Sequence, residues 1–285
     1  MEIKLAKYSG FCYGVKKAID MVINTRNKTN LPIYIPGYLV HNQQVIEYLT
    51  NKNIKTVSDL KGITPPGIVV IRAHGMGYKK IREIEEAGFK IINATCPNVL
   101  NVQKLADFLT KENYFLIVIG EKNHPEVIGI TEYSRNDKFL VIEDVKDFFK
   151  NRGLIKNKKI GVITQTTQYS ENLKSIISEL VDISKELRIF NTICQTTKQR
   201  QKSALQLTKK VDIMIVVGSL QSANTCRLTE LCKEIIPTYQ VETSAGLQAE
   251  WLKKVKIIGV TAGASTPDWV IIEVINKLKE IGNNN

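Results

Sequence analysis

Short apolar runs alternate with segments of helical periodicity along the whole chain. The runs are four to six residues long and rich in Ile and Val, which is typical of strands, and the segments between them repeat apolar residues at helical spacing. Parallel strands need such helix-length crossovers, so the pattern predicts an α/β fold with parallel sheets. The predicted strands lie at 31–35, 68–71, 89–92, 114–119, 139–142, 159–163, 187–190, 213–217, 238–241 and 257–260. The predicted helices lie at 15–23, 45–49, 78–87, 99–109, around Leu205, at 227–234 and at 269–281.

Three cysteines occupy the same kind of position in this pattern. Cys12, Cys96 and Cys194 each follow a short run that contains apolar residues and precede a predicted helix, and Pro97 is suited to the first position of the helix after Cys96. A helix N-terminus favours negative charge and therefore the thiolate, which is the form that binds metals or attacks electrophiles. A single cysteine among apolar neighbours usually serves packing. The recurrence is what favours a chemical role.

The spacing of polar residues after these cysteines also recurs. Three polar residues follow them by 29, 28 and 28 positions, each four residues past a glycine that closes an apolar run: His41, His124 and Ser222. Three more follow by 62, 70 and 71 positions: His74, Thr166 and Ser265. The spacing predicts a threefold internal repeat. Because ligands of open parallel sheets bind at the carboxyl ends of strands, a pseudo-threefold axis would bring these residues to one cleft.

The repeat divides the chain into three predicted units of about equal length. We expect an α/β fold of three pseudo-threefold-related units with small, parallel-rich sheets around one central cleft. No low-complexity linker separates the units, so we expect them to pack tightly. The predicted units are 1–97, with Cys12, His41 and His74; 98–193, led by Cys96, with His124, Glu126 and Thr166; and 194–285, with Cys194, Ser222, Asn224 and Ser265.

Charge and composition restrict the partners. The formal charge of +12 and a pI near 9.3 favour an anionic partner, namely a phosphorylated small molecule, an acidic protein or nucleic acid, although lysine-rich solvated faces would give the same numbers. The lysines are scattered without an aromatic stacking platform, so we do not expect nucleic acid. The sequence has no run near the roughly 18 apolar residues of a membrane span and no apolar h-region in its first ten residues. We therefore expect a cytoplasmic protein without a membrane partner.

The five cysteines favour metal binding or catalysis over disulfides, because the count is odd and no export signal is evident. Structural zinc sites close with four ligands drawn from tight pairs such as C-x-x-C, and the sequence has no such pair. Iron-sulfur clusters also usually take four cysteines, so three distant thiolates suggest a cluster with one open iron. We interpret Cys226 and Cys232, six residues apart on a predicted helix, as packing residues and not as a fourth ligand.

The remaining candidates suit an anionic substrate and a proton donor. The three histidines of the chain all follow predicted strands, and with Ser222, Asn224 and Ser265 they would form a donor-rich pocket for a phosphate or diphosphate. The small residues of 261–265 would let backbone N–H groups approach an anion, or form an ordinary tight turn. Glu126 would serve as a general acid, or interact with a helix dipole in a first turn. The hydroxyls of 164–167 would orient a substrate alcohol, or cap the next helix.

Eight motifs in one order resemble those of a known enzyme family. They are Gly-Phe-Cys-Tyr-Gly-Val at 10–15, Val-His-Asn at 40–42, Arg-Ala-His-Gly at 72–75, Ala-Thr-Cys-Pro at 94–97, His-Pro-Glu at 124–126, Thr-Gln-Thr-Thr at 164–167, Thr-Ile-Cys at 192–194 and Gly-Val-Thr-Ala-Gly-Ala-Ser at 259–265. With them the chain resembles the 4-hydroxy-3-methylbut-2-enyl diphosphate reductases, the last enzymes of the non-mevalonate isoprenoid pathway.

The resemblance implies a cofactor, a substrate and roles for the candidate residues. It implies a trefoil of three α/β units around a central metal-cluster cleft, with one 4Fe-4S cluster held by Cys12, Cys96 and Cys194. An open iron of this cluster would take the allylic hydroxyl. It further implies two electrons delivered singly by a ferredoxin or flavodoxin, and release of water to give isopentenyl and dimethylallyl diphosphates. Glu126 and Thr166 would serve the hydroxyl and its proton delivery. The implied diphosphate-binding residues are His41, His74, His124, Ser222, Asn224 and Ser265.

Two departures and one alternative accompany the resemblance. Where the family commonly has Lys-Asn-Ser-Ser-Asn, residues 220–224 read Leu-Gln-Ser-Ala-Asn, so Ala223 lacks a serine hydroxyl. After Cys194 the chain reads Gln-Thr-Thr, a mild change. The alternative is a non-catalytic iron-sulfur or zinc sensor of a phosphorylated ligand, which would have no need of a proton donor such as Glu126.

Overall fold

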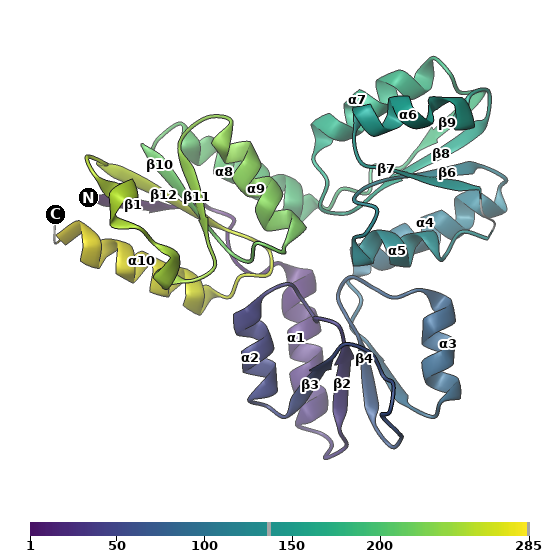
Figure 1. The fold of residues 1–285 in the computed structure, drawn as a ribbon, viewed down its shortest axis with the longest axis horizontal. Helices are drawn as coiled ribbons and strands as arrows, with labels where there is room; N and C mark the ends of the chain where they lie inside the picture. The colour runs from purple at the N-terminus through teal and green to yellow at the C-terminus, as the bar shows by residue number, and fades with distance from the viewer. Residues whose placement is uncertain (136–137, 284–285) are drawn as a thin grey trace. The chain divides into compact units, whose positions relative to one another are not determined.

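The computed structural model describes residues 1–135 and 138–283 of the chain (Figure 1). The chain forms two compact units. We call Met1–Lys16, Val40–Asn51 and Gln195–Asn285 the terminal unit, and Lys17–Leu39 with Lys52–Cys194 the central unit. Within the described residues, no helix combines the length and the apolar character that crossing a bilayer requires.

Three four-stranded sheets form the framework, and every strand pair in them is parallel. The fold is therefore α/β, as the alternating pattern predicts. In the central unit the first sheet has the order β3 (Ile54–Val57), β2 (Ile33–Pro36), β4 (Ile68–Ile71), β5 (Lys90–Asn93). Its second sheet has the order β7 (Phe139–Ile142), β6 (Phe115–Ile119), β8 (Lys159–Thr164), β9 (Glu186–Ile189). The sheet of the terminal unit has the order β11 (Thr238–Val241), β10 (Ile213–Val217), β12 (Ile257–Ala262), β1 (Glu2–Leu5).

The three sheets share one strand order. Numbered along the chain within each sheet, the order is 2-1-3-4 in both sheets of the central unit. The terminal sheet has the same order when β1, the first strand of the chain, is counted as its fourth strand. The threefold repeat seen in residue spacing is thus also a repeat of sheet topology.

Helices connect the strands, as the helical periodicity predicts. Their bounds are α1 (Tyr13–Arg26), α2 (Gln43–Thr50), α3 (Tyr78–Glu86), α4 (Pro97–Lys111), α5 (Pro125–Thr131), α6 (Val145–Ile155), α7 (Ser170–Val181), α8 (Gln195–Thr208), α9 (Ala223–Lys233) and α10 (Asp268–Asn283). Two short 3₁₀ turns, η1 (Ser244–Gly246) and η2 (Ala249–Leu252), follow β11.

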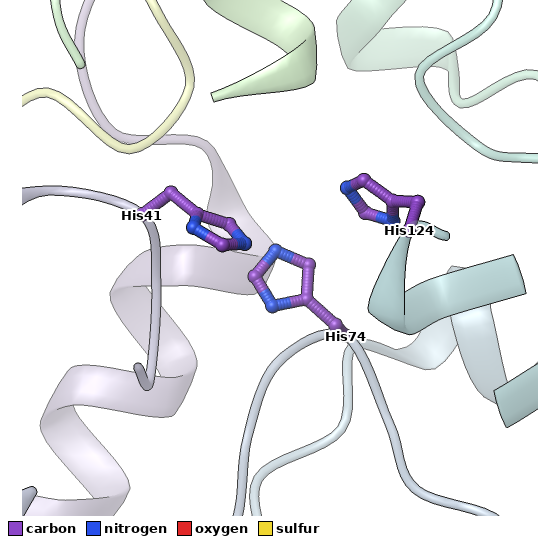
Figure 2. A group of neighbouring side chains, drawn as sticks. All are labelled: His41, His74 and His124. Atoms are coloured by element: carbon purple, nitrogen blue, oxygen red, sulfur yellow. The ribbon is translucent and has the colours of Figure 1, made fainter. Parts of the chain in front are cut away.

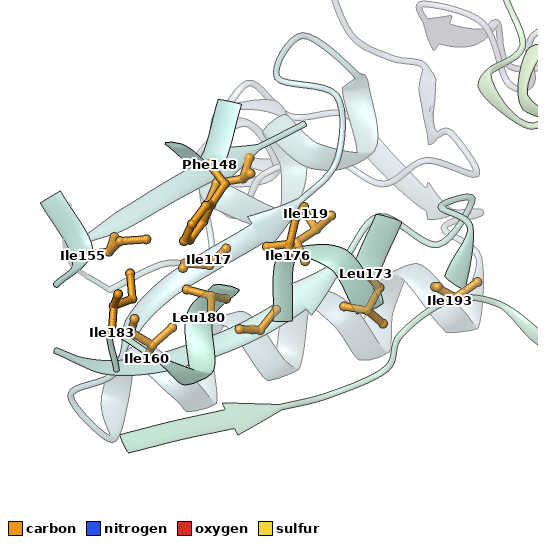
Figure 3. Packing of buried hydrophobic residues seen from close by; sticks show 12 residues of the cluster. Ile117, Ile119, Phe148, Ile155, Ile160, Leu173, Ile176, Leu180, Ile183 and Ile193 are labelled. Carbon is orange, nitrogen blue, oxygen red and sulfur yellow. The ribbon is translucent and has the colours of Figure 1, made fainter. Parts of the chain in front are cut away.

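The second sheet of the central unit is covered on both faces, which explains its continuous apolar strands. Successive residues of β6 alternate between two cores. Ile117 and Ile119 pack with Phe148 of α6 and Ile176 of α7 (Figure 3). On the other face Leu116 and Val118 pack with residues of α4 and α5, and Figure 1 shows these two helices on the side of the sheet opposite α6 and α7.

The terminal sheet is covered in the same way. Residues Ile213 and Ile215 of β10 pack with Val274 and other apolar residues of α10. Met214 between them packs on the opposite face with residues of α8 and α9. Because helices cover both faces of these two sheets, the strand ends are the part of each that is left for binding.

The sequence pattern missed two strands, three helices and both 3₁₀ turns of the described residues. The strands β1 and β3 have mixed polar and apolar residues and a poor strand signal, and β1 joins the terminal sheet and not a sheet with its neighbours in sequence. The sequence analysis also gave no bounds for α5, α6 and α7. The unit boundaries at 97 and 193 stay predictions, and residues 284–285 of the predicted third unit lie outside the described residues.

Candidate functional site

The three candidate ligand cysteines occupy equivalent positions in the three sheets. Each follows the fourth strand of a sheet and immediately precedes a helix: Cys96 lies between β5 and α4, Cys194 between β9 and α8, and Cys12 between β1 and α1. The predicted placement of these thiols at strand-to-helix turns is confirmed.

A repeated backbone hydrogen bond ties each cysteine to the turn after the third strand of its sheet. The N–H of Cys96 donates to the carbonyl of Ala73 at 3.0 Å, that of Cys194 to Thr166 at 2.9 Å, and that of Cys12 to Ala264 at 3.0 Å. Ala73 precedes His74 and Ala264 precedes Ser265. The contact therefore places each cysteine beside one of the three polar residues His74, Thr166 and Ser265.

The sulfur atoms of Cys12 and Cys194 accept hydrogen bonds from groups near helix N-termini. In the terminal unit the N–H of Val15, in the first turn of α1, donates to Cys12 Sγ at 3.4 Å. In the central unit Asn98 Nδ2 donates to Cys194 Sγ at 3.1 Å, and Asn98 is the second residue of α4, whose N-cap is Cys96. The N-terminus of α4 thus carries Cys96 as its N-cap and contacts the sulfur of Cys194 through Asn98. All three cysteines are thiols, not disulfides, and are partly exposed, so their sulfur atoms fit the ligands of a metal cluster.

Glu126 and Thr166 form a buried pair in the central unit. The N–H of Thr166 donates to Glu126 Oε1 at 2.6 Å, and its hydroxyl donates to Oε2 at 2.9 Å. Glu126 is only 2% exposed. Since the carbonyl of Thr166 also accepts from Cys194, this threonine connects the carboxyl group with one of the candidate ligands.

His124 and His74 lie next to each other in the central unit. His124 is the N-cap of α5, and its Nδ1 accepts from the N–H of Glu126 at 3.1 Å. This contact assigns the proton of a neutral ring to Nε2. The rings of His74 and His124 meet edge to face with centroids 5.5 Å apart, and a nitrogen of one lies within 4.8 Å of a nitrogen of the other (Figure 2). Two imidazoles are therefore available to one anion.

The terminal unit brings together the other candidate binding residues. Ser265 Oγ donates to the carbonyl of His41 at 3.1 Å. Ser222 is the N-cap of α9 after β10, and the neighbouring strand β12 leads to Ser265. Asn224 is 8% exposed, and its buried Nδ2 has no hydrogen-bond partner among the described residues. A buried amide donor without an acceptor is costly, which fits a group that pairs with a ligand.

Cys226 and Cys232 do not belong to this set. Cys232 is fully buried in the core beneath α9, and burial raises the pKa of its thiol to about 12. Cys226 Sγ donates to the carbonyl of Leu220 at 3.1 Å. The interpretation of Cys232 as a packing residue is confirmed, and Cys226 is held by the turn that precedes α9.

Arg200 is a residue of the site that sequence reasoning missed. It is 2% exposed on α8, and it donates from Nε to the carbonyl of Ala262 at 3.0 Å and from Nη2 to that of Gly10 at 2.5 Å. The side chain thus ties the turn that carries Cys12 to the end of β12. Its one sequence signal is a basic residue on a face of α8 that also bears buried residues, and this signal is weak.

Replacing Arg200 by methionine should lower the free energy of unfolding by about 2–4 kcal/mol, because two buried carbonyls lose a charged donor. Urea unfolding followed by circular dichroism measures the change. Lys202→Met, on the exposed side of the same helix, is the matched control and should change it by less than about 0.5 kcal/mol. Equal stability of the two variants would contradict the assigned role.

The described residues define an α/β protein with three parallel sheets, whose strand ends carry the cysteines and the candidate anion-binding residues. The comparison with protein families is consistent with this class: the model described as "LytB protein" matches residues 3–279. The chain belongs to the LytB family.

Known relatives match over the full length. The chain is 40% identical over 287 residues to the 4-hydroxy-3-methylbut-2-enyl diphosphate reductase of Trichlorobacter lovleyi, with 100% of both chains covered. It is 39% identical to the enzyme of the same name from Aquifex aeolicus, with 99% of this chain and 97% of the relative covered.

Solved structures give the same result. A structure of (E)-4-hydroxy-3-methyl-but-2-enyl diphosphate reductase, described as the terminal enzyme of the non-mevalonate pathway, is 38% identical with a TM-score of 0.72, covering 98% of this chain and 100% of that one. The Plasmodium falciparum E-1-hydroxy-2-methyl-but-2-enyl-4-diphosphate reductase is 30% identical with a TM-score of 0.91, covering 98% and 88%. The resemblance found in the sequence motifs is thereby confirmed.

Proposed function

We propose that the protein reduces (E)-4-hydroxy-3-methylbut-2-enyl diphosphate to isopentenyl and dimethylallyl diphosphates, as the last step of the non-mevalonate pathway, in the cytoplasm. In this reaction two electrons and two protons convert the allylic alcohol: the C–O bond breaks, a C–H bond forms and water leaves. The observation that carries the proposal is Thr166, which bonds to the carboxyl group of Glu126 and to the backbone of Cys194. A proton source and a candidate metal ligand thus meet at one residue.

The proposed cofactor is one 4Fe-4S cluster held by Cys12, Cys96 and Cys194, with one open iron. The equivalent positions of the three cysteines, each at a helix N-terminus after a fourth strand, support this ligand set. When bound, the cluster would supply single electrons and a Lewis-acidic iron for the substrate oxygen. The chain's own residues have to supply the protons and hold the diphosphate.

Glu126 and Thr166 form the proposed proton relay. The hydroxyl of Thr166 donates to Glu126, so its oxygen keeps lone pairs that can accept from the substrate alcohol. When Glu126 is protonated, it can pass a proton to Thr166 Oγ1 while Thr166 passes its own to the departing hydroxyl. The burial of Glu126 keeps bulk water away from this exchange.

The diphosphate would be held by neutral donors. His74 and His124 in the central unit, and His41, Ser222, Asn224 and Ser265 in the terminal unit, are the proposed binding residues. The buried Nδ2 of Asn224, which has no hydrogen-bond partner among the described residues, supports this assignment. Ala223, the first residue of α9, adds no hydroxyl to this set.

Replacing Asn224 by alanine should raise KM for the diphosphate about tenfold to a hundredfold, because a hydrogen bond to a charged group is lost. The value of kcat should change much less, since the amide is assigned to binding. Steady-state kinetics under anaerobic conditions measure both. Gln221→Ala, an exposed neighbour in the same turn, is the control and should leave KM unchanged. A loss of kcat at constant KM would remove Asn224 from the binding set.

The function is tested by anaerobic turnover. Protein reconstituted with iron and sulfide should be brown and, with a chemical reductant, should convert the allylic diphosphate into both products, identified by mass spectrometry. A sensor of the same ligand would bind the diphosphate without product. If the protein is colourless and binds zinc, or if it binds the diphosphate without forming product, the reductase proposal is wrong and the sensor is favoured.

A further inference from the structure

We propose that an acidic one-electron carrier protein docks on the edge of the second sheet of the central unit, at a patch formed by Phe108, Arg188 and Phe190. This inference rests on the proposed function, because the reduction needs electrons delivered one at a time. The patch belongs to α4 and to the segment that leads from β9 into Cys194, the two elements that meet at the thiol of Cys194.

The patch is a charged group stacked on two rings. The guanidinium of Arg188 lies 4.9 Å from the ring centroid of Phe108 and 5.4 Å from that of Phe190. The two rings meet edge to face with centroids 6.4 Å apart. Both phenylalanines pack against the core between the sheet and α4, so Arg188 is held on a fixed base. Arginine on an aromatic base is typical of interface anchors.

The side chain of Arg188 is accessible to a partner. It is exposed on β9, an edge strand, and it takes part in none of the ion pairs between described residues. The pKa of the nearby Glu186 carboxyl is lowered by hydrogen bonds with Tyr114 and Lys159, and to a smaller extent by the charge of Arg188. Glu186 pairs with Lys159 at 3.4 Å, and Asp107 pairs with Arg135.

Two lysines extend the positive surface along α4. Lys104 and Lys111 are exposed and lie four residues before and three residues after Phe108, which places them beside it on the helix surface. Glu112, exposed at the end of α4, is the acidic neighbour. The surface is therefore basic, which complements an acidic carrier and fits the formal charge of +12.

The patch leads directly to Cys194. Asn98, which contacts Cys194 Sγ, is ten residues before Phe108 on α4, so the two are about 15 Å apart along the helix axis. Phe190 lies four residues before Cys194, a span of at most about 14 Å. A carrier bound to the patch would bring its own redox group to the part of the central unit that bears the thiol of Cys194. Electron-transfer partners associate through small, transient interfaces, which suits a patch with a single anchor.

The test is the affinity of the full-length protein for an acidic ferredoxin as the probe, measured by titration calorimetry at low ionic strength without substrate. Arg188→Glu should weaken binding at least about tenfold, and Arg188→Gln should weaken it less. Glu112→Lys should tighten binding. Arg152→Glu, the same charge change at an exposed position on α6, is the matched control and should stay within about twofold of wild type.

Turnover separates this proposal from the proposed function. Arg188→Glu should lose activity with reduced ferredoxin and keep it with a small chemical reductant. If wild type fails with the chemical reductant, the proposed function is wrong, whereas the binding measurements still decide the docking site. Equal affinities of Arg188→Glu and Arg152→Glu would overturn the docking site. The docking site would also be overturned if the changes in ferredoxin affinity among the variants were explained by a change of the protein between monomer and dimer.

Discussion

Turnover should fall by about two to four orders of magnitude when Glu126 is replaced by glutamine. The amide keeps the shape of the carboxyl group and the N-terminal position on α5, but it cannot carry the proton that the departing hydroxyl needs. Because Glu126 holds Thr166 through both of its oxygens, the variant also presents an NH₂ group where one oxygen accepts a hydrogen bond. Single-turnover kinetics with chemically reduced protein isolate this step from electron delivery.

A matched variant separates proton delivery from helix electrostatics. Glu171 lies in the first turn of α7 as Glu126 lies in the first turn of α5, but it is exposed. Glu171→Gln should therefore retain wild-type turnover. Undiminished product formation by Glu126→Gln would show that the carboxyl group acts only on the helix dipole. Cluster absorbance, unchanged in both variants, confirms that the comparison concerns the proton.

Replacing Cys194 by serine should abolish the intact cluster. A serine hydroxyl at this position would still accept from Asn98, but it is a poor substitute for a thiolate as an iron ligand. The expected result is loss of the visible sulfide-to-iron absorption and of most of the iron per chain, measured after anaerobic reconstitution. Cys12→Ser and Cys96→Ser should give the same result, since the three cysteines hold equivalent positions.

Cys226→Ser is the control for this series. The thiol of Cys226 contacts a backbone carbonyl that a serine hydroxyl can also reach, so the fold and the cluster should persist. Full iron content in Cys194→Ser together with loss in Cys226→Ser would reverse the ligand assignment. Circular dichroism of each variant excludes unfolding as the cause of lost iron.

Much of the fold follows from local sequence. The strands with continuous Ile and Val, such as β6 and β10, lie within a residue of their predicted positions because burial on both faces requires such runs. The strand β3 contains a lysine and a threonine among four residues, and its short length gives no detectable period. The strand β1 is recognisable only through its pairing with β12, which lies more than 250 residues further along the chain.

The candidate site was predictable to a similar extent. The repeat in spacing identifies the candidate residues that follow the first, third and fourth strands of each sheet. This works because the three sheets share one strand order and carry their polar residues at the same strand ends. The contact between Glu126 and Thr166 joins residues 40 positions apart, and no local pattern encodes it. Arg200 was missed for the same reason, because its partners Gly10 and Ala262 are distant in sequence and are backbone carbonyls.

The placement of β1 affects how the protein is made. The ribosome synthesises β1 more than 250 residues before its partner β12, so the edge of the terminal sheet stays open throughout that interval. The two sheets of the central unit can pair their strands earlier, because the four strands of each sheet follow one another along the chain. The sheet of the terminal unit is therefore the last of the three to form. The backbone hydrogen bond from Cys12 to Ala264 can form only at that stage. On the proposed ligand set, the site for the cluster would be completed only after β12 has been synthesised.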